Sequence, residues 1–184
     1  MSVQRSENLM SYVFANLSKV FNDSLYRNSL FLILSRLLNV ISGFFFWVVA
    51  AKLYPLKDVG QGTALISSLG LIILFSSVGL DLTLVHFILI WDKEKVFNTS
   101  LVLTTISTAA ISILYYVIQS LFQINLLANL AHGLLFMLIA IFNSIALITG
   151  NMFCALKKGQ YYFIQILIQS SRLLLLFLLV NFAG

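Results

Sequence analysis

Long apolar stretches, separated by short polar or charged breaks, make up most of this chain. Five windows are almost wholly apolar, at about 29–51, 59–80, 97–118, 126–150 and 161–183. A helix needs about 20 apolar residues to cross a bilayer, whereas a strand of a membrane barrel needs about 10 residues of alternating polarity. The run Leu173–Val180 does not alternate. The pattern therefore predicts five membrane-spanning helices.

The breaks between these windows carry residues that end helices. Tyr54-Pro55 follows the first window, and proline cannot continue a helix without losing a backbone hydrogen bond. The charged runs Asp92–Lys95 and Lys157-Lys158 separate later windows. The apolar piece Leu82–Trp91 is too short to span. We expect it to extend the second helix or to lie at the membrane interface.

Composition narrows the class of protein. Of 184 residues, 60% are hydrophobic and 9% are charged, whereas soluble domains carry about 25% charged residues. This excludes an ordinary soluble enzyme, a disordered chain and a nucleic-acid binder, despite the net charge of +5. The single cysteine, Cys154, excludes a disulfide framework or a cysteine-rich metal site. We expect an all-α integral membrane protein.

No catalytic chemistry is visible in the sequence. The metalloprotease, serine-hydrolase and P-loop patterns are absent. The acidic pair Asp92 and Glu94 lies beside lysines and is interpreted as a solvated turn, and His86 and His132 lack metal-site spacing. We therefore expect no enzymatic activity, no metal and no cofactor.

The distribution of cations predicts the orientation. With the N-terminus inside, inner segments hold seven basic residues and outer segments hold only Lys52 and Lys57. This bias indicates a cytoplasmic N-terminus in the cell membrane. Residues 1–28 place apolar side chains at four-residue spacing, which predicts an amphipathic segment on the inner leaflet, with a loose tail as the alternative. Residues 29–184 form the transmembrane domain in this interpretation.

Two arginines stand inside the apolar windows. Arg36 lies roughly 10 Å and Arg172 roughly 16 Å into its window at the helical rise. Such charges usually face a protein interior or a watery cavity. None of the six carboxylates lies inside a window. Either further helices supply carboxylates, or the partner is an anion such as phosphate, which guanidinium groups grip with two donors.

Polar residues also form stripes on the predicted helices. Arg36, Asn39 and Gly43 share one face, and so do Tyr162, Gln165, Gln169 and Arg172. The third window carries a stripe at four-residue spacing, for which close helix packing is favoured over a substrate path. Its members are Ser100, Thr104, Thr108, Ser112 and Tyr116.

Several short motifs point to one family. They are Ser35-Arg36, Ala50-Ala51-Lys52-Leu53-Tyr54-Pro55, Val59-Gly60-Gln61-Gly62, Gly79-Leu80-Asp81-Leu82 and the basic turn Ala155–Tyr161. In this order they resemble the beginning of oligosaccharide-lipid flippases of the multidrug/oligosaccharidyl-lipid/polysaccharide exporter superfamily. The resemblance implies a bundle of 12–14 helices in two halves, with a central basic cavity that receives a lipid-linked diphosphate. It implies Arg36 and Arg172 as phosphate contacts, and Asn39, Gln165 and Gln169 as hydrogen-bonding partners of the substrate.

Three functions are open at this point. The first is translocation of lipid-diphosphate-linked oligosaccharide for polysaccharide biosynthesis, with membrane lipids and a missing C-terminal half of the transporter as partners. This expectation treats the chain as a piece of a larger flippase, because no polar anchor follows the fifth window and alternating access needs two halves. The second is antiport of cationic drugs in the same superfamily. The third is a non-transporting membrane scaffold.

Overall fold

The protein is all-helical where its structure is described. The computed structural model describes residues 24–77, 79–122, 127 and 129–171, and these ranges contain no strand. Within these ranges, four helices are long and apolar enough to cross a membrane, and they confirm the first four predicted windows. The elements are α2 Ser24–Leu53, α3 Leu56–Ser77, α4 Leu80–Phe87, α5 Lys93–Leu121, α6 Leu130–Ala155 and α7 Gly159–Ser170.

Two predicted segments extend beyond the described ranges. Helix α7 covers the start of the fifth window, and the rest of that window, with Arg172, lies outside the described residues. The predicted amphipathic segment lies outside them as far as residue 23. Residues 24–28 already belong to α2, so the predicted boundary at residue 28 falls within a continuous helix.

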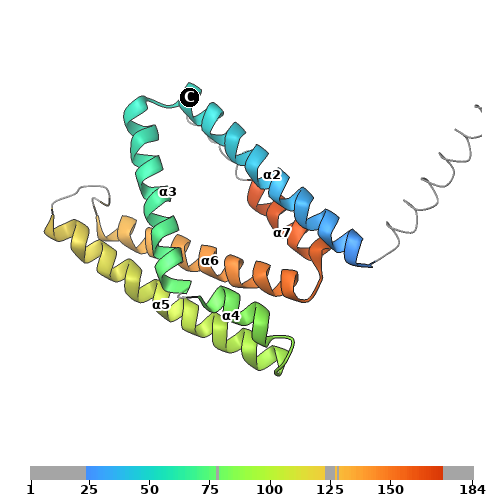
Figure 1. Ribbon diagram of the computed structural model, residues 1–184. Coiled ribbons are helices and arrows are strands. Elements are labelled where there is room, and N and C mark those ends of the chain that lie inside the picture. The colour runs from blue at the N-terminus through green and yellow to red at the C-terminus, as the bar shows by residue number, and fades with distance from the viewer. Residues whose placement is uncertain (1–23, 78, 123–126, 128, 172–184) are drawn as a thin grey trace, which may run out of the picture.

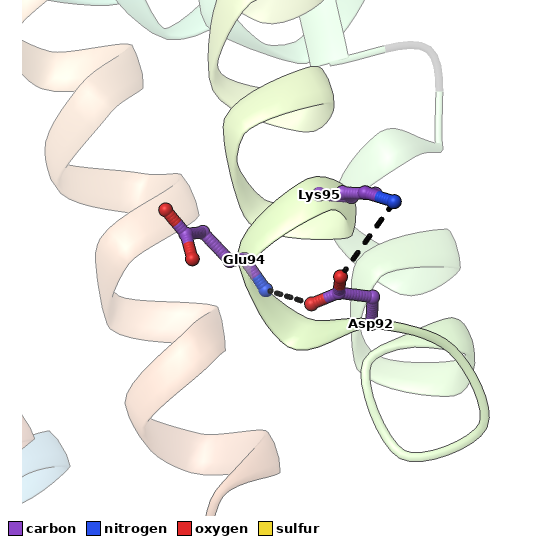
Figure 2. Close-up of polar contacts among 3 residues, drawn as sticks. All are labelled: Asp92, Glu94 and Lys95. Atoms are coloured by element: carbon purple, nitrogen blue, oxygen red, sulfur yellow. Dashed lines mark hydrogen bonds and ion pairs between the residues drawn. The ribbon is translucent and has the colours of Figure 1, made fainter.

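Local sequence signals explain where the helices end. Pro55 stands between α2 and α3, and its carbonyl accepts hydrogen bonds from the N–H groups of Asp58 and Val59 in the first turn of α3. The carboxylate of Asp92 caps α5 by accepting a bond from the Glu94 N–H at 3.2 Å. Figure 2 shows this cap, together with the exposed ion pair between Asp92 and Lys95.

The short helix α4 is a separate element and does not continue α3. Gly79 adopts a left-handed conformation with φ of 76° between the two helices, a region in which glycine avoids the Cβ clash. Helix α4 lies against α5 and α6 (Figure 1). Leu84 of this helix and Ile88, the residue that follows it, are fully buried in one cluster with Ile148 and Ala155 of α6. Burial of this apolar face explains why the ten-residue piece leaves the line of α3.

The helices form two groups. Helices α3, α4, α5 and α6 pack together, while α2 lies mainly along α7 and diverges from α3 beyond their shared corner (Figure 1). The contacts of α2 with α7 run in the same order along both helices. They are Asn28 with Gly159, Phe31 with Phe163, and Ser42 with Ser170. The two helices are therefore parallel.

The stripe on α5 is a packing seam, as predicted. Ser100, Thr104, Thr108 and Ser112 are all buried, and the Thr108 hydroxyl lies 3.0 Å from that of Ser76 on α3. Nearby, the Tyr115 hydroxyl donates to Ser68 of α3 at 2.7 Å. Interhelical hydrogen bonds and small side chains hold helices together in hydrocarbon, where burial of apolar surface alone provides little drive.

Candidate functional site

A polar cavity lies where the α2–α7 pair faces the rest of the bundle. Its volume is about 300 Å³, and its walls come from α2, α3, α6 and α7. Five carboxamide side chains line it, and no charged side chain does so among the described residues. The five are Asn39, Asn143, Asn151, Gln165 and Gln169.

Helical spacing explains why these amides converge. Asn143, Leu147 and Asn151 recur every four residues on α6, and Gln165 and Gln169 do the same on α7. Residues four apart lie on one helix face. Gly150 lets the two helices approach, because an added Cβ there would lie 3.0 Å from the Tyr162 ring. The three amides predicted from the sequence are thus brought together, and two more join them.

Hydrogen bonds within the protein use only some of the donors and acceptors of these carboxamides. Gln165 is fixed to α6, since its Nε2 donates to the Ala146 carbonyl at 2.6 Å, yet its Oε1 is buried with no partner in the described ranges. Asn143 donates to the Ile139 carbonyl of its own helix at 2.8 Å. Each carboxamide carries both donors and acceptors. The cavity can therefore match a neutral, hydroxyl-rich ligand without burying a charge.

Arg36 lies next to this cavity and does not form its wall. The side chain is exposed on α2, one turn before Asn39. No carboxylate pairs with Arg36 within the part of the chain that the structure describes. Arg172 lies outside the described residues, so the predicted pair of arginines is not brought together here.

The described residues offer no metal centre. No group of three or more His, Cys, Asp or Glu side chains converges in these ranges. Asp92 and Glu94 are both exposed, in agreement with their interpretation as a solvated turn. The Asp92 carboxylate caps α5, and Figure 2 shows the Glu94 carboxylate pointing away from it.

The sequence interpretation missed Asn143 and Asn151 as site residues. Their eight-residue separation with Leu147 between them places all three on one face of α6. That spacing was a usable signal, but only the parallel pairing of α2 with α7 shows that Asn39 faces the same cavity. A comparison of the chain with protein-family models, curated proteins and solved structures finds no match.

Proposed function

We propose that this chain is part of a membrane transporter that moves lipid-diphosphate-linked oligosaccharide across the cell membrane, with the N-terminus in the cytoplasm. The observation that carries the proposal is the cavity of about 300 Å³ lined by five carboxamides and no carboxylate among the described residues. Polar side chains inside membrane spans are costly and usually face a protein interior or a water-filled cavity. Neutral amides suit sugar hydroxyls, since both groups donate and accept hydrogen bonds.

The diphosphate of the substrate requires cations, and the intramembrane arginines supply them in this proposal. Arg36 adjoins the amide cavity on α2, and Arg172 follows Gln169 by three positions in the sequence. A guanidinium binds two phosphate oxygens at once. We propose that the arginines hold the diphosphate while Asn39, Gln165 and Gln169 hold the sugar.

Alternating access requires a second lobe. Transporters of this kind rock one bundle against another around a central site. The missing partner of the α2–α7 pair is, in this proposal, a second helical bundle of the same transporter. Antiport of cationic drugs fits less well, because a cation site needs a buried carboxylate and none lines the described cavity.

The test is ligand binding to the whole 184-residue chain in lipid nanodiscs. The probes are a polyprenyl-diphosphate disaccharide and the same polyprenyl diphosphate without sugar, with retention measured by native mass spectrometry. Gln165→Leu and Gln169→Leu should remove the preference for the glycosylated probe. Arg36→Gln should weaken the binding of both probes. Gln61→Leu is the matched control, because Gln61 is exposed on α3 and does not line the cavity.

Three outcomes would contradict the proposal. The first is that the wild-type chain shows no preference for the glycosylated probe. The second is tight binding of tetraphenylphosphonium in place of the diphosphates, which would favour the drug antiporter. The third is co-purification of a stable complex with a different membrane protein and no lipid-linked sugar, which would favour the scaffold.

A further inference from the structure

A second cavity lies at the other end of the α2–α7 pair. Its volume is about 160 Å³, and it lies between the first turns of α2 and the turn that joins α6 to α7. Three cations line it, namely Arg27, Lys157 and Lys158. It shares no lining residue with the amide cavity, and no carboxylate lines it among the described residues.

The three cations are not neutralised by the described part of the protein. Within those ranges the ion pair is the one between Lys95 and Asp92, and none of the three cations takes part in it. Lys158 Nζ lies 5.7 Å from the centre of the Tyr161 ring, a contact that orients the ammonium and leaves its charge in place. The cavity is therefore a concentration of positive charge.

The backbone at the start of α7 adds hydrogen-bond donors to this basic cavity. Helix α7 begins at Gly159, so the positive end of its dipole faces the cavity. The Gly159 N–H is taken by Asn28 Oδ1 at 2.5 Å, whereas the Gln160 N–H has no carbonyl acceptor in the described residues. Helix N-termini with free N–H groups bind anions, phosphates above all.

The position of the cavity indicates which kind of anion it binds. It lies at the ends of membrane-length helices, beside the exposed Tyr161. Tyrosines are enriched at the depth of the lipid headgroups, and basic pockets between transmembrane helices bind anionic headgroups. We propose that this cavity binds the phosphate of an anionic membrane phospholipid. That lipid bridges the start of α2 to the α6–α7 turn.

The test compares lipids that differ only in headgroup charge. The full chain is purified in detergent, and retained phosphatidylglycerol or phosphatidylcholine with identical acyl chains is counted by native mass spectrometry. The double variant R27Q/K158Q should weaken phosphatidylglycerol retention about fivefold for each cation removed. Phosphatidylcholine retention should not change.

The matched control removes the same number of charges nearby. Lys93 and Lys95 start α5, whose Val96 and Phe97 pack against the buried cluster that contains Ala155, the last residue of α6. The double variant K93Q/K95Q should leave phosphatidylglycerol retention within about twofold, since these lysines do not line the cavity. Equal losses in the two double variants would overturn the site in favour of a general surface-charge effect.

A measurement on the wild-type chain keeps the proposal testable if R27Q/K158Q fails to fold. In phosphatidylcholine nanodiscs, added phosphatidylglycerol should shift the NMR signals of the Gly159 and Gln160 amides, and inorganic phosphate should not. Equal shifts with inorganic phosphate would show that the cavity binds free phosphate, and would contradict the proposed binding of a lipid. No shift with either probe would overturn the site. Both readouts are independent of sugar binding, so this inference can fail while the transport proposal stands.

Discussion

Asn28 Oδ1 accepts a hydrogen bond of 2.5 Å from the backbone N–H of Gly159, joining residues 131 positions apart in the chain. The bond ties the first turns of α2 to the first residue of α7 and sets the register of this parallel pair. An added Cβ at Gly159 would lie 2.7 Å from Asn28 Oδ1 and 2.8 Å from the Asn28 carbonyl oxygen. The close approach therefore depends on glycine.

Gly159→Ala should destabilise the protein by roughly 1–3 kcal/mol, because the added methyl group meets backbone that cannot rotate away. The measurement is reversible unfolding in SDS–detergent mixtures, followed by circular dichroism. Gly70→Ala on α3 is the control, since an added Cβ there has no atom within 4 Å. It should be neutral or stabilise the helix by about 0.5–1 kcal/mol. Similar losses in the free energy of unfolding for both variants would show that the close contact with Asn28 does not cause the effect at Gly159.

The buried bond between Thr108 and Ser76 should have a measurable coupling energy. A double-mutant cycle with Thr108→Val and Ser76→Ala should give about 0.6 kcal/mol and no more than about 1.7 kcal/mol. Thr105→Val with Ser76→Ala is the matched cycle, because within the described residues the Thr105 hydroxyl bonds only to the Leu101 carbonyl of its own helix. That cycle should show no coupling. A coupling of the same size there would mean that hydroxyl removal acts within α5 alone.

Apolar length and helix-breaking residues predicted most of the described fold. Four windows became helices, and Pro55 and Asp92 mark the boundaries as expected. Whether the piece Leu82–Trp91 extends the second helix or lies apart from it stayed open in the sequence, because hydropathy is similar on both sides of Gly79, whose left-handed conformation separates α4 from α3. The cost of that break is offset by the burial of Leu84 and Ile88, which depends on Ile148 and Ala155 of α6, at least 60 positions further along the chain.

The candidate site was predictable only within single helices. Spacing placed Gln165 and Gln169 on one face of α7, and this is correct. Spacing along one helix does not show which neighbouring helix a polar face packs against. The convergence of Asn39 with Asn143 and Asn151 is therefore visible only in the packed structure. Arg36 shows the same limit: it shares the face of Asn39 by period, yet its long side chain lies outside the cavity wall.

Two left-handed residues should respond to substitution with opposite signs. Lys157 has φ of 56° at the end of α6, where its N–H bonds to the Cys154 carbonyl and the Lys158 N–H to that of Phe153. Glycine is the preferred residue at such a helix end. Lys157→Gly should therefore stabilise the protein by about 1 kcal/mol, whereas Gly79→Ala should destabilise it by about 1–2 kcal/mol. The same SDS unfolding assay, in neutral detergent without anionic lipid, measures both.

Lys157→Ala separates backbone strain from charge in that experiment. It removes the same cation as Lys157→Gly but keeps the Cβ that disfavours positive φ. It should leave the free energy of unfolding nearly unchanged. If Lys157→Ala stabilised the protein as much as Lys157→Gly does, repulsion between Lys157 and its basic neighbours would be the cause, and the strain argument would be wrong.

The amide cavity should admit water, which the neighbouring lipid-facing surface excludes. Asn143 lines the cavity, whereas Phe142, one residue earlier on α6, is 69% exposed and does not line it. In a Cys154→Ala background, Asn143→Cys should react with a membrane-impermeant maleimide about tenfold or more faster than Phe142→Cys, because the reactive thiolate forms in water and not in hydrocarbon. Labelling rates in intact nanodiscs provide the measurement. Faster labelling at position 142 would place the carboxamides against lipid, and the proposal that they bind sugar would lose its basis.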